Sequence, residues 1–126
     1  MLNNDRNIYR TIDVNANRVK EGLRVIEEYF RFFEENNGVM LDIREMRHRI
    51  NSILKNVYSK LLESRRIDTD YGKDIKEGNR DSISDTITAN CKRVQEGLRV
   101  LEEFSKILGK EIFSEFKDMR FRMYNL

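Results

Sequence analysis

The sequence contains one eleven-residue segment twice, 75 positions apart. Residues 18–28 read RVKEGLRVIEE and residues 93–103 read RVQEGLRVLEE, so nine of the eleven positions are identical. The match resumes further along the chain, where IREMRHRI at 43–50 corresponds to FKDMRFRM at 116–123. Self-similarity at a fixed offset indicates a duplicated structural unit. The chain is therefore constrained to build one motif twice.

Both copies carry apolar residues three and four positions apart, which is the spacing of one face of an α-helix. The composition agrees, because the chain has no proline and only six glycines. We predict an all-α fold, a helical bundle of two tandemly duplicated helical hairpins with pseudo-two-fold symmetry. A chain of 126 residues should form a single domain. The apolar series are Val19, Leu23, Ile26, Phe30 and Phe33, and then Val94, Leu98, Leu101 and Phe104.

The predicted boundaries follow from the repeat and from residues that cap or break helices. We expect the first unit over 11–63, a polar linker over 64–83 and the second unit over 84–126. In the first unit, either Asp13 or Asn15 should cap the first helix. The expected end of that helix is the Asn-Asn-Gly turn at 36–38, and one continuous helix should follow over 39–63. In the second unit, helices are expected over 84–108 and 111–124, separated by Gly109.

Charge, cysteine content and hydropathy exclude several classes of protein. The 24 Lys and Arg residues nearly balance 22 Asp and Glu residues, which does not indicate a nucleic-acid-binding protein. A single cysteine, Cys91, rules out an internal disulfide and fits a reducing compartment. No stretch approaches 18 apolar residues, and the start MLNNDRNIYR lacks the apolar segment of a signal peptide. We expect a soluble cytoplasmic protein that does not cross a membrane.

One set of duplicated polar residues has the spacing of a charged ladder along a helix. Pairs of opposite charge at this spacing contribute only a few tenths of a kcal/mol each, about 0.2–0.5. We interpret the ladder as mainly solvated helix surface. Its members are Glu21, Arg24 and Glu28 in the first copy, and Glu96, Arg99 and Glu103 in the second.

A second set lies beside the apolar face, within about 60° of arc on the helix. Its members are Asn15, Arg18 and Gly22, and their counterparts Asn90, Arg93 and Gly97. Glycine within a helix costs about 1 kcal/mol relative to alanine, so the two glycines should serve close packing or ligand access. The arginines either stabilise a helix crossing or form an anion pocket with two quasi-equivalent guanidinium groups. The pattern alone leaves both interpretations open.

The segments MRHR and MRFR add further arginines, of which only one in each segment can face a common pocket. Residues two apart on a helix diverge, and we take Arg47 and Arg120 as the candidates. The single histidine, His48, has Phe121 at the equivalent position, so we do not expect it to bind a metal. The sequence contains no GxxxxGK[ST], GxGxxG or CxxC motif.

The string N-x-x-R-x-x-E-G-L-R-V-x-E-E, present twice, resembles a specific small family of thiamine-pathway proteins. These are all-helical hydroxymethylpyrimidine phosphate kinases, often fused to thiamine-phosphate synthase. The resemblance covers nearly the whole chain and includes the linker pieces Ser64-Arg65 and Asp70-Tyr71-Gly72. Two features depart from the family: the linker RRIDTDYG has no proline, and the synthase domain is absent. The chain is accordingly either a free-standing version or an excised domain.

The resemblance implies transfer of the γ-phosphoryl group of ATP to the phosphate of 4-amino-5-hydroxymethyl-2-methylpyrimidine phosphate, with Mg²⁺, to give the diphosphate. The acceptor oxygen is already anionic, so catalysis reduces to alignment and charge neutralisation. Arg18 and Arg93 are the candidate catalytic residues, assisted by Arg47 or Arg120. The remaining candidates are Asn15 and Asn90 for the pyrimidine edge or as caps, Gly22 and Gly97 beside them, and Asp70, Glu21 and Glu96 for Mg²⁺.

Two other functions remain open at this stage. The domain is alternatively a non-catalytic helical module that regulates or binds a partner, because a fold does not entail a function. It could also bind nucleic acid through its arginine-rich segments, although the near-neutral charge argues against that. Besides the pyrimidine phosphate and ATP, the expected partners are thiamine-phosphate synthase and a second copy of the chain.

Overall fold

The computed structural model describes residues 3–65, 72–109 and 111–126, and these residues form helices and loops without any strand. The all-α prediction is confirmed. None of the helices in these ranges is long and apolar enough to cross a membrane. In chain order the elements are α1 (Asn3–Phe32), α2 (Asn37–Ile53), the 3-10 helix η1 (Lys55–Val57), α3 (Tyr58–Glu63), α4 (Ile83–Ile107) and α5 (Ile112–Tyr124).

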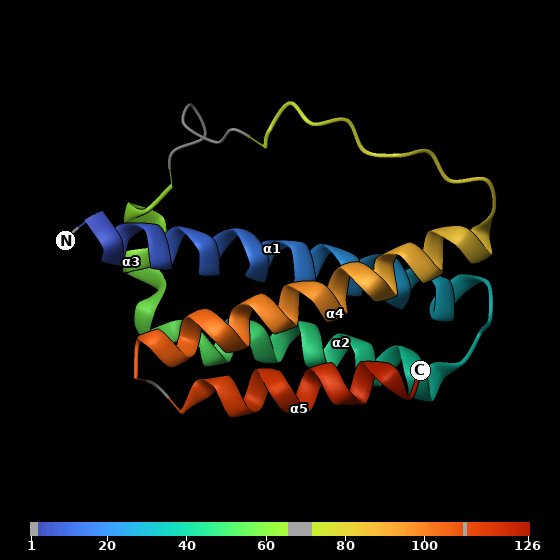
Figure 1. Cartoon of the computed structure of the whole chain (residues 1–126). Helices are drawn as coiled ribbons and strands as arrows, with labels where there is room; N and C mark the ends of the chain where they lie inside the picture. Colours follow the sequence, from blue (N-terminus) through green and yellow to red (C-terminus); the bar gives the residue numbers. More distant parts are fainter. Residues whose placement is uncertain (1–2, 66–71, 110) are drawn as a thin grey trace.

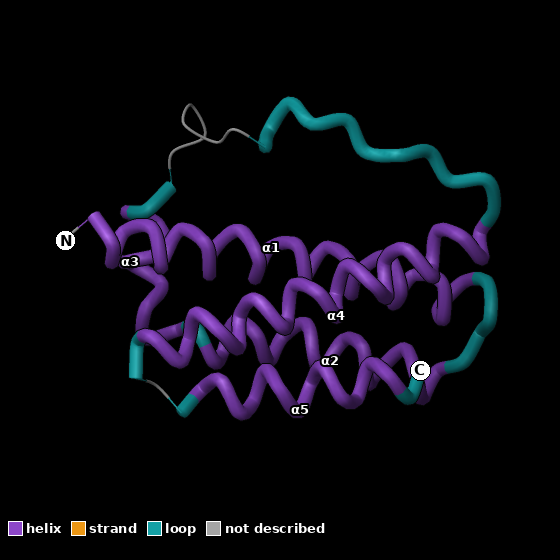
Figure 2. The backbone as a smooth tube through the Cα atoms, viewed as in Figure 1, coloured by secondary structure: helices purple, strands orange, loops and turns teal. Residues whose placement is uncertain are grey.

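The two long helices form the centre of the bundle. α1 packs on α4, while α2 packs on α1 and α5 packs on α4, so each long helix carries the second helix of its own hairpin (Figure 1). The short α3 turns away from α2 toward the N-terminal part of α1. Figure 2 shows the described part of the linker, residues 72–82, running along α1 to the start of α4, on the side away from α2 and α5. A strip of the central pair therefore lies beneath the linker.

Two glycines allow α1 and α4 to approach closely. A Cβ atom on Gly97 would lie 2.6 Å from Cγ2 of Val19, and one on Gly22 would lie 2.8 Å from Cγ2 of Val94. The contacts are reciprocal, because each glycine meets the valine that follows the arginine of the other repeat. Of the two roles considered for these glycines, close packing is the one that both perform.

The first helix begins earlier than the sequence indicated. α1 starts at Asn3, so Asp13 and Asn15 lie within it and neither is its cap. The apolar face continues upstream through Tyr9 and Ile12, which are buried in the core and extend the helix by more than two turns. The predicted N-cap was wrong because the apolar series was taken to begin at Val19, which left out Tyr9 and Ile12.

The turn and the helix that follow also differ from the prediction. α1 ends at Phe32, and Asn36 caps α2 by accepting a hydrogen bond from the backbone N–H of Val39. The single helix expected over 39–63 is broken at Leu54 into α2, η1 and α3. The break has a packing reason: Leu54 and Leu61 are both buried, and α3 reaches α1 only by leaving the direction of α2.

The second hairpin agrees with the sequence to within one residue at each boundary. Its helices were expected over 84–108 and 111–124, and α4 and α5 occupy these positions. Gly109 adopts a φ of +66°, in the left-handed region where glycine carries no steric penalty. This residue therefore ends α4 as predicted.

Candidate functional site

A cavity of about 390 Å³ lies between the linker and the α1/α4 pair. Its volume is within the range of small-ligand sites, about 300–1,000 Å³. Arg18 reaches it from α1 and Arg93 from α4, so the two arginines singled out by the duplication line one cavity. The lining residues are Asn15, Arg18, Gly72, Ile75, Glu77, Arg93, Glu96, Gly97 and Val100.

Both arginines retain capacity for an anion. Arg18 is exposed, and no carboxylate in the described part of the chain forms an ion pair with it. Nη1 of Arg93 lies 3.3 Å from Oε1 of Glu77 in the linker, whose side chain is 70% exposed. A solvent-exposed pair of this kind contributes about 0–1 kcal/mol, so a ligand phosphate can replace Glu77 at little cost.

The duplicated asparagines have equivalent backbone interactions but different surroundings. Nδ2 of Asn15 donates to the carbonyl oxygen of Thr11 at 2.9 Å, and Nδ2 of Asn90 donates to that of Thr86 at 2.8 Å. Asn15 is buried and lines the cavity, whereas Asn90 does not line it. Only the first asparagine is placed to contact a ligand there.

The structure describes two of the three predicted metal-binding carboxylates, Glu21 and Glu96, and does not bring them into one cavity. Glu96 lines the cavity one helical turn from Arg93, whereas Glu21 is exposed on α1 outside it. Asp70 lies outside the described residues. Within the described ranges, no three His, Cys, Asp or Glu side chains converge on one point. Of the two candidate carboxylates that the structure describes, Glu96 is the one that shares a cavity with both arginines.

Arg47 and Arg120 lie elsewhere, each beside a buried glutamate. Nε of Arg47 donates to Oε1 of Glu27 at 3.1 Å, and Glu27 is 2% exposed. Nη2 of Arg120 donates to Oε1 of Glu102 at 3.2 Å, and this carboxylate is the main cause that raises the pKa of the guanidinium. Neither arginine lines the cavity under the linker. Their role in phosphate binding stays a prediction, and their observed partners are carboxylates.

The buried glutamates are the residues that the sequence interpretation missed. Arg24 lies 3.1 Å from Glu28 and 3.7 Å from Glu27, and Arg99 repeats this arrangement with Glu103 and Glu102. The exposed ends of this ladder are solvated, as expected. Glu27 and Glu102 are instead enclosed between two arginines each. Their identity in both copies was the available signal, but only the neighbouring Glu28 and Glu103 were selected from the sequence, as members of the solvated ladder.

Comparison with known proteins identifies the family. The sequence matches the ThiD2 family over residues 10–126. The chain belongs to the ThiD2 family. Arg18, Arg93 and the other described residues that line the cavity all lie within the matched range.

Several curated relatives of this ThiD2 member are thiamine-phosphate synthases. Those of Synechococcus sp. (strain CC9605) and Nostoc punctiforme are 33% and 37% identical over 125 and 122 residues, which is 97% and 94% of this chain. The synthase of Thermosynechococcus vestitus is 35% identical over 120 residues. The chain spans about a third of the length of these relatives, with 35%, 34% and 33% of them covered. No solved structure is significantly similar. The similarity relates the chain to thiamine biosynthesis.

A second and larger cavity, of about 580 Å³, lies on another face of α1. It is bounded by the end of α2, η1 and α3. Asp13 accepts two hydrogen bonds from Arg65, at 2.9 and 3.0 Å, and this carboxylate raises the pKa of the guanidinium. The lining residues are Asp13, Ala16, Asn17, Lys20, Asn51, Leu54, Lys55, Tyr58, Leu61 and Arg65.

Proposed function

We propose that this chain is a kinase that converts 4-amino-5-hydroxymethyl-2-methylpyrimidine phosphate to its diphosphate with ATP. The observation that carries the proposal is the meeting of Arg18 and Arg93, from two different helices, in one cavity of ligand size. Membership of the ThiD2 family and similarity to thiamine-phosphate synthases support a reaction in thiamine biosynthesis. The resemblance in the repeated motif supplies the substrate.

The proposed reaction needs no strong base. An oxygen of the substrate's phosphate forms a bond to the γ-phosphorus of ATP, the bond from that phosphorus to the β,γ-bridging oxygen breaks, and ADP leaves with the electron pair. The second ionisation of a phosphate monoester has a pKa of about 6, so the attacking oxygen is already anionic at neutral pH. The enzyme must therefore bring two anions together and stabilise the transferring group.

The cavity offers groups suited to that task. The guanidinium groups of Arg18 and Arg93 approach from opposite helices and can each form two hydrogen bonds to phosphate oxygens. Glu77 would leave Arg93 when the ligand phosphate arrives. Asn15, which lines the cavity, is the candidate to contact the aminopyrimidine edge, and Val100 would provide an apolar surface for the ring.

Magnesium fits this site as an ion shared with the substrates. Mg²⁺ at phosphoryl-transfer sites is often bound by one or two carboxylates together with substrate phosphates. Glu96 supplies a carboxylate in the cavity, and Asp70 and Glu21 remain candidates for the same role. When bound, Mg²⁺ would neutralise charge on the phosphates, while the two arginines orient them.

The proposal is tested by incubating purified protein with ATP, Mg²⁺ and the pyrimidine monophosphate, and following the products by ³¹P NMR. We expect two new diphosphate resonances from the pyrimidine product together with those of ADP. ATP consumption should require the pyrimidine phosphate. Folded protein that forms no diphosphate over many hours would contradict the kinase proposal.

A second candidate function has its own structural support. An apolar groove of about 330 Å³ lies where the C-terminal part of α1 meets the start of α4, and its wall includes Phe33 and Ile83, which are 64% and 49% exposed. Exposed apolar surface of this kind is typical of partner-binding regions. The alternative is a non-catalytic module that binds a thiamine-phosphate synthase. Co-elution of the two proteins, abolished by Phe33→Glu, together with no kinase activity, would favour it.

A further inference from the structure

The larger cavity, which we call the α1/α3 groove, has the charge of an anion site. Asp13 is the one carboxylate among the described lining residues, and it is neutralised by Arg65. Nζ of Lys20 donates to Oδ1 of Asn51 at 2.9 Å, a neutral partner. Among the described residues, no carboxylate forms an ion pair with Lys55. The groove therefore presents two positive charges that no described acid offsets.

The same groove also offers an aromatic ring above an apolar floor. Tyr58 lines it and is 53% exposed, so the ring is accessible to a ligand. Leu54 and Leu61 are buried and close the floor. An accessible tyrosine next to lysines suits a ligand that combines a flat heteroaromatic ring with phosphates. Nucleotides have this combination.

The groove is not part of the duplicated framework. At the positions of Asp13, Asn17 and Lys20, the second repeat has Thr88, Lys92 and Gln95. The helix break at Leu54, which turns Lys55 and Tyr58 toward α1, falls after the segment of α2 that is repeated in α5. The described residues that line the groove thus belong to the first repeat unit and the start of the linker, whereas both units contribute an equivalent arginine to the cavity under the linker.

The two cavities are close enough to serve one reaction. Asn17 faces the α1/α3 groove, and the next residue, Arg18, faces the cavity under the linker. They lie about 100° apart around the same turn of α1, with the exposed strip of the helix between them. A ligand longer than the groove can cross this strip. Its far end would then reach the phosphate that we place between Arg18 and Arg93.

We propose that the α1/α3 groove binds the nucleoside triphosphate, with its base on Tyr58 and its phosphates beside Lys20 and Lys55. The triphosphate runs past Asn17 toward Arg18, where the pyrimidine phosphate is held. This inference rests on the proposed kinase function for the direction of the triphosphate. The presence of a nucleotide in the groove is a separate claim that binding alone can test.

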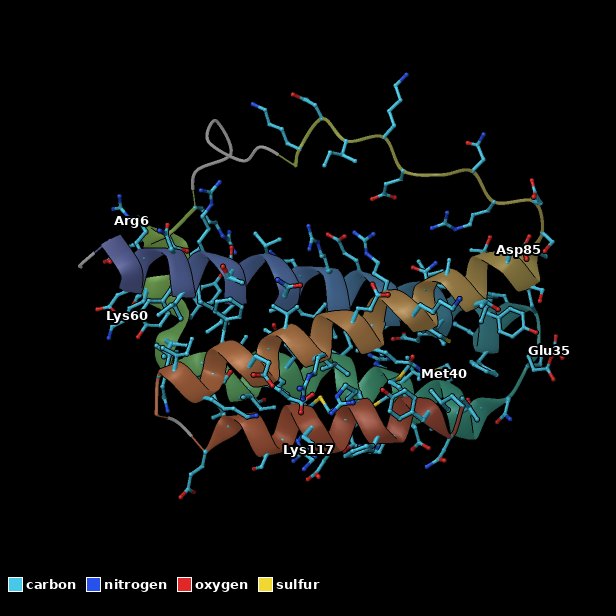
Figure 3. The ribbon with its side chains drawn as sticks, in the orientation of Figure 1. Arg6, Glu35, Met40, Lys60, Asp85 and Lys117 are labelled. Carbon is cyan, nitrogen blue, oxygen red and sulfur yellow. The ribbon has the colours of Figure 1, made fainter. Side chains whose placement is uncertain are left out.

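The test is calorimetric titration of the protein with a non-hydrolysable ATP analogue and Mg²⁺. We expect Tyr58→Leu and Lys55→Ala each to weaken binding about tenfold, as loss of one stacking or charge contact would. The matched controls are Tyr124→Leu and Lys117→Ala on α5; Figure 3 shows Lys117 on the side of the bundle away from the linker. The controls should bind within about twofold of the native chain. Tyr58→Phe, which keeps the ring, should bind almost normally, which would assign the loss in Tyr58→Leu to the ring and not to the hydroxyl; unchanged melting temperatures of the variants would exclude misfolding.

Two further titrations separate the alternatives. Inorganic triphosphate should bind more weakly than the analogue and should respond to Lys55→Ala but not to Tyr58→Leu. The pyrimidine monophosphate should respond to neither change. The assignment would be overturned, even if the chain is a kinase, by equal affinity of the ATP analogue for all variants. It would also be overturned if the variants weakened binding of the pyrimidine phosphate and not of the analogue. Conversely, variant-sensitive nucleotide binding without diphosphate formation would retain the groove and reject the kinase.

Discussion

Glu102, which is 1% exposed in α4, is held by the guanidinium group of Arg120 from α5. The first hairpin has the same arrangement, with Glu27 of α1 held by Arg47 of α2. Each pair joins the two helices of one hairpin, at positions that the duplication preserved. The motif therefore carries a buried charged connection as well as an apolar face, and the first prediction concerns that connection.

Replacing Arg120 with methionine should destabilise the protein strongly. The change keeps most of the side-chain volume but leaves Arg99 as the only basic partner of Glu102 among the described residues. The side chain of Arg99 is 55% exposed and lies 3.6 Å from Glu102. Removing one partner of a buried pair costs about 3–5 kcal/mol of folding stability. Because Arg99 remains, we expect the free energy of unfolding to fall by about 3 kcal/mol. Urea denaturation measures it. Arg122→Met, at an exposed position of the same helix, should change the free energy of unfolding by less than about 0.5 kcal/mol; equal effects would contradict this account.

Gly97→Ala should also destabilise the bundle, although alanine is the better helix former. The new Cβ would lie 2.6 Å from Cγ2 of Val19, whose β-branched side chain has little freedom to move in a helix. Overpacking costs about 1–3 kcal/mol, and improved helix propensity offsets about 1. The difference is about 0–2 kcal/mol, and because a 2.6 Å contact calls for the upper part of the overpacking range, we expect a net loss of about 1–2 kcal/mol in thermal or chemical denaturation.

The control for this prediction is Gly38→Ala in α2. A Cβ there would meet nothing closer than Oδ1 of Asn36 at 3.7 Å, so stability should be unchanged or higher. Combining Gly97→Ala with Val19→Ala should cost less than the sum of the two single changes, because the clash disappears. Strict additivity would show that the close approach of the two helices is not the reason that position 97 requires glycine.

An experimentally determined structure should show the two hairpins related by a pseudo-two-fold axis. The reciprocal glycine–valine contacts and the equivalent glutamate–arginine pairs are what such an axis requires. We expect residues 11–50 to superpose on 86–123 as one rigid unit. A different angle between the two helices in each hairpin would contradict the predicted symmetry.

Partial burial raises the pKa of the Cys91 thiol. Because the thiolate is the reactive form, iodoacetamide at pH 8.5 should modify Cys91 more slowly in the folded chain than in urea. The same shift makes the folded state favour the neutral thiol. Its contribution to stability is therefore complete below the ordinary thiol pKa and is lost as pH rises through the higher folded value. Cys91→Ala should remove this part of the alkaline decline in the free energy of unfolding.

The sequence predicted the helical class and the second hairpin well because the apolar spacing and Gly109 are local signals. It did not predict the break at Leu54, because local apolar spacing continues across that residue. What interrupts the helix is a distant contact, the burial of Leu61 against α1. The early start of α1 is a different case, since Tyr9 and Ile12 were visible in the pattern but were not used.

The candidate site was predicted in part. The duplication identified Arg18 and Arg93, and the structure brings both to one cavity with Asn15, Glu96 and Gly97. The duplication could not indicate that the linker residues Ile75 and Glu77 would complete the cavity wall, because nothing in their local sequence determines the path of the linker. The burial of Glu27 was also not predicted, since a glutamate three residues from an arginine has the same spacing whether it is exposed or enclosed.

The central claim is that Arg18 and Arg93 bind the substrate's phosphate and do not stabilise the fold. Arg→Lys keeps the positive charge but removes bidentate hydrogen bonding. Neither residue has a buried partner in the described part of the chain, so both variants should melt within about 1 °C of the native protein. Arg122→Lys on α5 serves as the matched control and should leave both stability and turnover unchanged.

The most direct measurement is therefore kcat/KM for the pyrimidine phosphate in Arg18→Lys and Arg93→Lys, with melting temperatures recorded on the same samples. We expect each change to lower kcat/KM at least tenfold, about 1.4 kcal/mol of transition-state stabilisation, with no loss of stability. The two residues need not respond equally, because Glu77 forms an ion pair with Arg93 and not with Arg18. Unchanged turnover in both variants, or activity that falls only as the folded fraction falls, would contradict the anion site.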